Sequence, residues 1–233
     1  MKKRILVFGA GSGIGKALLE KLSNSPFGTE SLVIGFSRRG EAQSSSFQHG
    51  KNYHLDLSEK DLESKLTRFF EMIDFEQGNV CLYFAQGDGL FQPVQNVQKE
   101  DVSAHFQLNV FSILSILKQI YPYISKMNNL TLVFLSSTAS KMGFPNSSSY
   151  VASKHSVAGI AKSIREEWKD LGVKVVNVYL GAVYTEIWNE RTEFSPSDMI
   201  SVTELADFLS NFSFLPKSLY VDEVHITPRK GIL

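Results

Sequence analysis

The sequence predicts a doubly wound α/β domain with a mostly parallel sheet, because strand-length apolar runs alternate with segments of helical periodicity. These runs are continuously apolar rather than alternating, which is typical of strands that helices cover on both faces. A glycine-rich turn between the first run and the first helical segment agrees with this architecture. The expected strands are Ile5–Phe8, Leu32–Phe36, Val80–Phe84, Leu130–Leu135 and Val173–Leu180.

The helical segments between these runs differ in length. The first is short, at Lys16–Leu22, whereas two later ones are long. One of the long helices is expected over Lys99–Lys126, with a distortion near Pro122 because proline cannot donate a backbone hydrogen bond. The other is expected over Ser149–Leu171, where Gly172 ends it.

Two polar stretches, Glu41–Gly50 and Glu186–Asp198, are rich in loop-forming residues and are expected to be loops. The tail Leu219–Leu233 contains a short apolar stretch that suits an edge strand or a subunit contact. Because neither a linker nor a repeat interrupts the pattern, residues 1–233 are expected to form a single domain, with the substrate loop near 186–198.

Composition restricts the functional class. The 24 basic and 24 acidic residues balance and are scattered, so the chain lacks the basic patch of a protein that binds nucleic acid or an anionic membrane. Cys81 is the only cysteine, which excludes an internal disulfide and fits a reducing, cytoplasmic compartment. The apolar run after Met1–Arg4 is too short for an export signal, and no window is long enough to span a membrane.

Tyr150 and Lys154 are the first candidate reactive pair. Their spacing places both side chains on one helix face, where an ammonium can stabilise a phenolate and lower the phenol pKa from its ordinary value near 10. A phenol tuned in this way exchanges protons near neutral pH. About 0.6 such pairs are expected by chance, so the pair needs support from the rest of the chain.

A glycine loop follows the first expected strand and opens the first helix. A turn without side chains lets the backbone approach a pyrophosphate, and a helix N-terminus offers free N–H groups and partial positive charge. A dinucleotide is therefore expected there; the alternative is a tight turn in which the glycines serve only the connection. The residues of this loop are Gly9, Gly11, Ser12, Gly13, Ile14 and Gly15.

The end of the second strand is expected to choose the cofactor. An acidic residue there would bind ribose hydroxyls, whereas this chain has Ser37, Arg38 and Arg39. Two guanidinium groups suit a 2′-phosphate, so NADP(H) is expected over NAD(H). The alternative is that both arginines are solvated loop charges.

With a glycine loop at its start and Tyr-x-x-x-Lys beyond its middle, the chain resembles the short-chain dehydrogenase/reductase family, of the shorter single-domain type. The resemblance covers nearly the whole chain. Ser137 lies thirteen residues before Tyr150, as the catalytic serine of the family does, and Asn109 matches the asparagine of the preceding long helix.

The resemblance implies a role for each of these residues. Tyr150 is expected to be the general acid or base, with Ser137 donating a hydrogen bond to the substrate oxygen. Lys154 is expected to tune the tyrosine and hold the nicotinamide ribose, and Asn109 to anchor a water that joins Lys154 to solvent. Further expected cofactor contacts are Asp56, Leu57, Ala85, Gly87, Gly181, Val183 and Thr185.

Simpler roles remain open for several of these residues. Ser137 alternatively caps the backbone after its strand, with Ser136 as a competitor for its role. Asn109 alternatively ties two helices together, and Asp56 alternatively begins a turn before the cap signal Ser58-x-x-Asp61. Thr185 alternatively is a loop hydroxyl without a role.

The chain departs from the family pattern at two places. Phe84-Ala-Gln-Gly87 stands where the family usually has Asn-Asn-Ala-Gly, so an asparagine that braces neighbouring strands is absent. Leu180 replaces the proline before the nicotinamide segment, which predicts a less rigid loop. Neither change removes an expected catalytic group.

The implied reaction is reversible reduction of a ketone or aldehyde, and an apolar or aromatic carbonyl compound is expected. The expected pocket walls are Phe91, Met142, Phe144 and Trp188. No metal is expected, since the five histidines lack ligand spacing. The alternative function is a catalytically weak NADP(H)-binding sensor or scaffold; a homo-dimer or homo-tetramer is expected from the long helices of the family.

Overall fold

The computed structural model describes residues 3–24, 31–40, 50–188 and 195–231. Within these ranges, all strands belong to one parallel sheet, in the order β3-β2-β1-β4-β5-β6-β7. The winding direction reverses between β1 and β4, which is where parallel sheets of this kind open a crevice. The strands are β1 Lys3–Phe8, β2 Ser31–Ser37, β3 Gly50–His54, β4 Asn79–Phe84, β5 Asn129–Ser137, β6 Lys174–Leu180 and β7 Glu223–Ile226.

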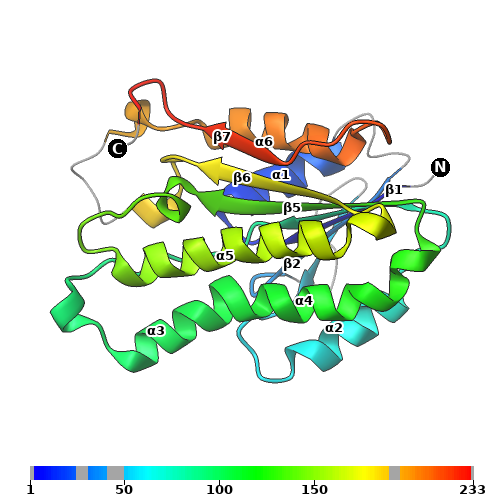
Figure 1. Ribbon diagram of the computed structural model, residues 1–233, viewed down its shortest axis with the longest axis horizontal. Coiled ribbons are helices and arrows are strands. Elements are labelled where there is room, and N and C mark those ends of the chain that lie inside the picture. The colour runs from blue at the N-terminus through cyan, green and yellow to red at the C-terminus, as the bar shows by residue number, and fades with distance from the viewer. Residues whose placement is uncertain (1–2, 25–30, 41–49, 189–194, 232–233) are drawn as a thin grey trace.

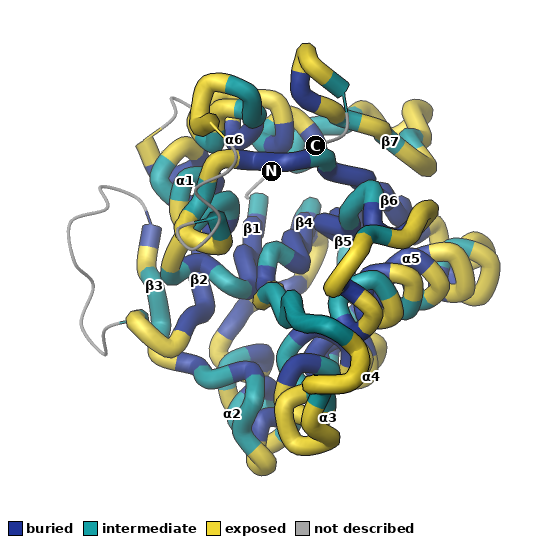
Figure 2. The backbone as a smooth tube through the Cα atoms, turned by 90° about the vertical axis from the view of Figure 1, so that its left-hand side faces the viewer, coloured by how far each residue is buried: buried dark blue, intermediate teal, exposed yellow. Residues whose placement is uncertain are grey.

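Helices cover both faces of the sheet, as Figure 1 shows, with α1 and α6 on one face and α2, α4 and α5 on the other. Each face has its own buried cluster, because alternate strand residues point to opposite sides. Figure 2 shows the buried strands enclosed by helices whose outer surfaces are exposed. The helices are α1 Gly13–Asn24, α2 Leu62–Glu71, α3 Lys99–Phe106, α4 Ser112–Ile120, α5 Ser148–Glu167 and α6 Val202–Ser210.

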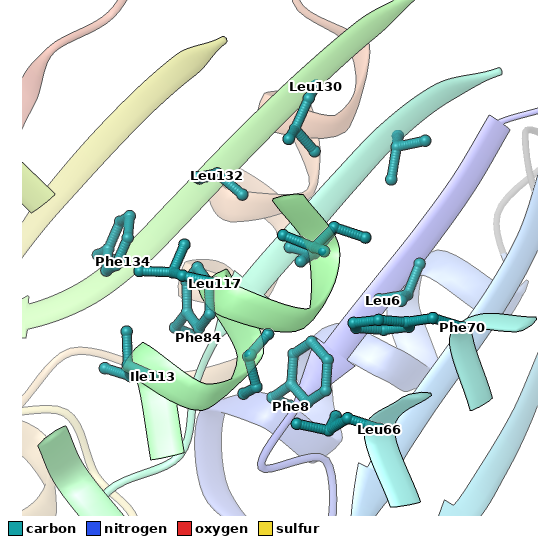
Figure 3. Close-up of a cluster of buried hydrophobic side chains, with 14 of the residues drawn as sticks. Leu6, Phe8, Leu66, Phe70, Phe84, Ile113, Leu117, Leu130, Leu132 and Phe134 are labelled. Atoms are coloured by element: carbon teal, nitrogen blue, oxygen red, sulfur yellow. The ribbon is translucent and has the colours of Figure 1, made fainter. Parts of the chain in front are cut away.

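A row of aromatic rings crosses the sheet near the carboxyl ends of four strands, from the last residue of β1 and β4 to a position three residues before the end of β5. Phe8 pairs in register with Phe36 of β2 and with Phe84 of β4, and Phe84 pairs with Phe134 of β5. The rings stack with centroid distances of 4.8 Å for Phe8–Phe36, 6.2 Å for Phe8–Phe84 and 4.5 Å for Phe84–Phe134. Figure 3 shows three of these rings among the side chains of α2 and α4. The row therefore aligns the carboxyl ends of four strands.

The expected doubly wound fold and all five expected strands are confirmed. The strand β3 was not among the five apolar runs, because at the sheet edge most of its residues are only partly buried and lack a continuous apolar run. Only the resemblance to the family implied a strand before Asp56. The expected loop Glu41–Gly50 meets β3 at Gly50, and its residues 41–49 lie outside the described residues. The tail supplies β7, so the expected edge strand is confirmed.

The segment expected as one long helix over Lys99–Lys126 is divided. The distortion near Pro122 is confirmed, since a 3₁₀ turn occupies Tyr121–Lys126. A π-helical turn at Gln107–Phe111 also separates α3 from α4, which no proline signals. The other long helix is confirmed over most of its length, and Gly172 follows it with φ 71°.

Among the described residues, no helix is both long and apolar enough to cross a membrane.

Replacing Phe134 with alanine tests the aromatic row. Phe134 is fully buried and stacked on Phe84, so Phe134→Ala is expected to lower the free energy of unfolding by about 3–5 kcal/mol, measured in urea. Met72→Ala is the control, because Met72 is 70% exposed and its loss should cost less than about 0.5 kcal/mol. A Phe134→Ala protein as stable as this control would contradict the structural role of the row.

Candidate active site

The glycine loop connects β1 to α1 at the carboxyl edge of the sheet. Gly9 has φ 85°, and a Cβ atom there would lie 2.5 Å from the backbone nitrogen of Gln86. A Cβ atom on Gly15 would overlap the Gly9 carbonyl group. The amides of Gly9 and Ala10 both donate to the Phe36 carbonyl, at 2.9 and 3.1 Å, which ties the loop to β2. Only glycine fits these two positions. The glycines of the loop therefore expose its backbone, without side chains, to the crevice.

Ser137 ends β5, with its hydroxyl at the start of a short 3₁₀ turn. Its Oγ accepts a hydrogen bond from the Ala139 amide at 3.1 Å, so the capping alternative describes a real contact. Ser137 lines the same cavity as the glycine loop, so the cap does not remove it from the site. Its neighbour Ser136 also borders the cavity but is 3% exposed, with no partner for its hydroxyl among the described residues.

Tyr150 and Lys154 lie one turn apart on α5, as the spacing predicted. The Lys154 Nζ atom is 5.8 Å from the centroid of the Tyr150 ring and donates to the Leu135 carbonyl at 3.3 Å. The Tyr150 ring packs beside Phe91 and His105, with centroid distances of 5.0 and 6.3 Å. The pair is therefore enclosed by β5, by the loop after β4 and by α3.

Burial changes the charge equilibrium of Lys154. The side chain is only 8% exposed, and desolvation lowers its pKa to about 8. A lysine with such a pKa is still mostly protonated at neutral pH, but it loses its proton at a lower pH than an ordinary lysine does. A Cβ atom on Gly87 would lie 3.3 Å from Nζ, so the glycine leaves room for the ammonium.

Asn109 lies in the π-helical turn and is almost fully buried. Its Oδ1 atom accepts from the Asp88 amide at 2.9 Å, and its Nδ2 atom donates to the Asp88 carbonyl at 3.0 Å. Asn109 does not line the cavity. These contacts tie the helical segment to the loop after β4. The helix-to-helix contact of the alternative is also present, since Nδ2 donates to the Ser153 hydroxyl of α5 at 3.4 Å.

The end of β2 carries the residues expected to choose the cofactor. Ser37 is buried and its hydroxyl contacts the Asn52 amide group at 3.2–3.3 Å, whereas Arg38 and Arg39 are exposed at the cavity. His54 Nδ1 lies 2.8 Å from the Arg38 carbonyl oxygen. The missed strand β3 therefore braces this turn, and nothing in the sequence pattern of Asn52 or His54 signals that.

Asp56 and Leu57 follow β3 and line the cavity as expected. The Asp56 carboxylate also accepts from the Ser58 amide at 2.9 Å, which is the turn contact of the alternative interpretation. The same side chain therefore shapes the turn and borders the site.

The segment after β6 closes the cavity opposite the glycine loop. The Gly181 amide donates to the Ile226 carbonyl at 2.8 Å, so β7 holds this segment even though Leu180 replaces the usual proline. The Thr185 methyl group is 3.3 Å from the place of a Cβ atom on Gly13, which brings the two segments face to face.

Gln86 contributes at the place where the chain departs from the family pattern. Its Nε2 atom donates to the Ser112 hydroxyl at 3.2 Å, and the Ser112 hydroxyl donates to the Leu108 carbonyl at 2.6 Å. Gln86 is buried and borders the cavity. Gln86, which follows the position where the family has its bracing asparagine, therefore ties the end of β4 to α4.

One cavity of about 700 Å³ collects most of the expected site residues. Asn109 and Gly15 are the expected residues outside its wall; Gly15 adjoins Gly9 and Ala85, and Asn109 adjoins Gly87, all three of which line it. Three of the expected wall residues, Phe91, Phe144 and Trp188, line the cavity. The prediction for Met142 is wrong, because Met142 does not border the cavity and is 43% exposed. Thr138, Ala139, Glu186 and Ile187 also line it and belong to the segments expected around the substrate. Lining residues outside the expected set include Leu55, Gln86, Asp88, Leu108, Pro145, Asn146, Ser147 and Ala182.

Among the described residues, no group of three or more histidine, cysteine and acidic side chains is arranged to hold a metal ion.

Lys154→Met tests the cost of the buried ammonium. The lowered pKa means that the folded state resists protonation of Lys154, a penalty of roughly 3 kcal/mol that is complete below about pH 8. The penalty fades as the pH rises from about 8 toward 10.5, the ordinary pKa. Lys154→Met is therefore expected to raise the free energy of unfolding by about 1–3 kcal/mol at neutral pH, and by less at about pH 9.5. Equal or opposite effects at the two pH values, measured in urea, would contradict the buried charge.

Comparison with known proteins agrees with this geometry. The family model described as short chain dehydrogenase matches residues 3–196. The uncharacterized oxidoreductase YusZ of Bacillus subtilis is 27% identical over 194 residues, which cover 81% of this chain and 68% of that protein. The NADPH-dependent 1-acyldihydroxyacetone phosphate reductase of Saccharomyces cerevisiae is 29% identical over 196 residues, covering 82% of this chain and 64% of that protein.

Among solved structures, serine dehydrogenase from Escherichia coli has the same fold, with a TM-score of 0.81 at 17% identity over 99% of this chain and 100% of that chain. Together with the family match over most of the sequence, this similarity extends from the glycine loop to the last strands. The chain therefore belongs to the short-chain dehydrogenase family, whose members are oxidoreductases that act on alcohol and carbonyl groups with a nicotinamide cofactor.

Proposed function

We propose that this protein is an NADP(H)-dependent oxidoreductase that transfers a hydride between nicotinamide and a carbonyl or secondary alcohol substrate. The observation that carries the proposal is that Ser137, Tyr150 and Lys154 line one cavity together with the glycine loop. Residues 1–233 form one cofactor-binding and catalytic domain in this proposal. Its substrate loop is 186–198, of which residues 189–194 lie outside the described residues.

The residues present fit a dinucleotide. Gly9, Gly11 and Gly13 line the cavity without side chains, and α1 offers its N-terminus to an anionic group. When bound, the cofactor supplies or takes up the hydride. The residues that would hold it are Gly9, Gly11, Ser12, Gly13, Ile14, Ser37, Arg38, Arg39, Asp56, Leu57, Ala85, Gly87, Tyr150, Lys154, Gly181, Val183 and Thr185, with Gly15 supporting the loop.

In reduction, the Tyr150 hydroxyl gives its proton to the substrate oxygen, and in oxidation the phenolate takes it back. The Lys154 ammonium stabilises the phenolate electrostatically, and its burial strengthens that interaction because little water screens it. Ser137 donates a hydrogen bond to the substrate oxygen, where negative charge develops. Asn109 keeps the loop after β4 in place and, in this proposal, anchors the water that returns protons to Lys154.

The lining of the cavity supports an uncharged substrate. Its only cationic side chains among the described residues are Lys154, at the reacting end, and Arg38 and Arg39, near the end of β2. Phe91 packs against the Tyr150 ring, and Phe144 and Trp188 add further aromatic surface. An apolar or aromatic ketone or aldehyde matches these walls, whereas an anionic substrate would lack a partner.

A homo-oligomer is also proposed. Apolar side chains on the segment from the π-helical turn to α4 are exposed, namely Phe111 at 49% and Leu114 at 46%. Exposed apolar surface of this kind is typical of a face that a second subunit covers.

Tyr150→Phe tests the proposed acid. The substitution removes one oxygen, so kcat for reduction is expected to fall by a factor of about a thousand or more, while the Kd for NADPH changes less than about threefold. The measurement is NADPH oxidation against a panel of neutral aromatic and aliphatic carbonyl compounds, with NADPH fluorescence titration for binding. Tyr184→Phe is the control, because Tyr184 is exposed and outside the cavity wall.

Unaltered turnover in Tyr150→Phe would contradict the mechanism. Tight NADPH binding without turnover of any compound by the wild-type protein would instead favour the sensor or scaffold function.

Arg38→Ala and Arg39→Ala test the cofactor preference. The wild-type protein is expected to bind NADPH more tightly than NADH, and each substitution is expected to weaken NADPH binding about tenfold with little change for NADH. Fluorescence titration gives both dissociation constants. Arg68→Ala is the control, since Arg68 is an exposed residue of α2 away from the cavity. Tighter binding of NADH by the wild-type protein would contradict the preference.

A further inference from the structure

His105 is a buried histidine beside the proposed catalytic residues, in the last turn of α3 and two residues before the π-helical turn. Only 6% of its surface is exposed. Its Nε2 atom lies 3.0 Å from the Ser153 hydroxyl and 3.1 Å from Asn109 Nδ2. A buried imidazole is stable when its nitrogens have suitable partners, so the role of Nε2 as donor or acceptor matters.

The contacts of Asn109 decide that role. The Asp88 amide can only donate, so the amide atom of Asn109 that faces it is the oxygen Oδ1. The other atom, which contacts the Asp88 carbonyl and His105, is therefore the nitrogen Nδ2. Because Nδ2 can only donate, Nε2 of His105 must accept. An accepting Nε2 carries no proton, so His105 is neutral with its proton on Nδ1.

The same Nε2 atom also faces α5. The Ser153 hydroxyl lies 3.0 Å from Nε2 and 2.8 Å from the Tyr150 carbonyl oxygen, and these two acceptors share its single proton. Ser153 directly precedes Lys154. The Nε2 atom of His105 thus lies between the π-helical turn and the turn of α5 that carries both proposed reacting groups. No other described side chain contacts both Asn109 and Ser153 by hydrogen bonds.

We propose that neutral His105 is a positioning residue: by accepting at Nε2 it holds Asn109 and the Tyr150–Lys154 turn together, and its protonation at acid pH releases them. The proposal rests on the proposed function, because it assumes that Tyr150 and Lys154 are the reacting groups. A proton on Nε2 would set two donors, Nε2 and Asn109 Nδ2, against each other at 3.1 Å. Asn109 would then keep its two Asp88 contacts and a long contact of 3.4 Å to Ser153.

The surrounding groups determine how readily this protonation occurs. Desolvation lowers the pKa of His105 most strongly; the Asp88 carboxylate of the loop after β4 raises it, and Lys154 of α5 lowers it again. The Tyr150 ring also faces it from α5, and Asp101 lies one turn earlier on α3, exposed. The net pKa lies below the ordinary 6.5.

The sign of the pH effect follows from that direction. Near neutral pH both the folded and the unfolded chain hold His105 mostly neutral, and its contacts are intact. As the pH falls, the unfolded chain takes up the proton first, so the folded state loses stability and then, below its own pKa, loses the contacts of Nε2.

His105→Gln and His105→Leu separate the acceptor from the side-chain volume. Glutamine offers an oxygen acceptor near the position of Nε2 but does not titrate, whereas leucine offers none. The measurement is kcat and KM for NADPH-dependent reduction between about pH 5 and 8.5. His155→Gln is the matched control, since His155 is an exposed histidine on α5 whose Nδ1 contacts its own helix at the Val151 carbonyl.

Wild-type kcat is expected to fall toward acid pH. His105→Gln should keep kcat within about threefold of wild type at about pH 8 and lose this acid decline. His105→Leu should lower kcat about tenfold at about pH 8 with little change in KM, as the loss of one hydrogen bond predicts. The His155→Gln profile should overlay that of the wild type. An acid decline that persists in His105→Gln would overturn the proposal, whether or not His105→Leu folds.

The ring nitrogens of His105 provide a second measurement that does not need turnover. In long-range ¹H–¹⁵N spectra assigned by comparison with His105→Gln, Nε2 is expected to be unprotonated at about pH 7.5, and the ring to titrate with a pKa below 6.5. A protonated Nε2 at that pH, or a pKa above 6.5, would overturn the inference. If the wild-type protein reduces no carbonyl compound, the proposed function fails, and these spectra still decide the protonation state of His105.

Discussion

The stacked row of Phe36, Phe8, Phe84 and Phe134 is the constraint on which the rest of the structure depends. Parallel strands can slip relative to each other, and a slip of one residue would turn every side chain to the opposite face. Rings that stack in register across four strands oppose such a slip. Because Phe8, Phe36 and Phe84 stand at or next to the ends of their strands, the row also sets the loops that follow these strands at a common level around the crevice.

Polar contacts act above this apolar layer. Asn109 holds the loop after β4, Gln86 ties the same strand end to Ser112, and Ser140 of the turn after β5 donates to the Lys154 carbonyl at 2.8 Å. Each contact joins segments that are distant in the sequence. The π-helical turn makes the first of them available, since it turns the Asn109 side chain toward Asp88 within an otherwise continuous helical segment. The loops around the crevice are therefore held in place by hydrogen bonds to residues in the layer beneath them.

The burial of Lys154 lowers the stability of the fold and, in the proposed mechanism, serves the reaction. A buried ammonium is costly, and desolvation lowers its pKa to about 8. In the proposed mechanism, the same desolvation makes its charge effective on the Tyr150 phenol, because water screens the interaction less. His105 stands in a related position: its burial disfavours the charged form, which keeps the acceptor that Asn109 requires. Both residues draw their properties from the packing of α5 against its neighbours.

Local patterns along the chain determined the strands, the glycine loop and the spacing of Tyr150 and Lys154, because apolar runs and helical periodicity are written in consecutive residues. The match to the family motifs brought Ser137 and Asn109 into the same set. Only the tertiary structure decided that β3 braces Ser37 through Asn52, that Met142 lies away from the cavity, and that His105 meets Asn109 and Ser153. These are contacts between segments far apart in sequence, and a hydrogen bond between two side chains exists only once packing has placed the donor and the acceptor together.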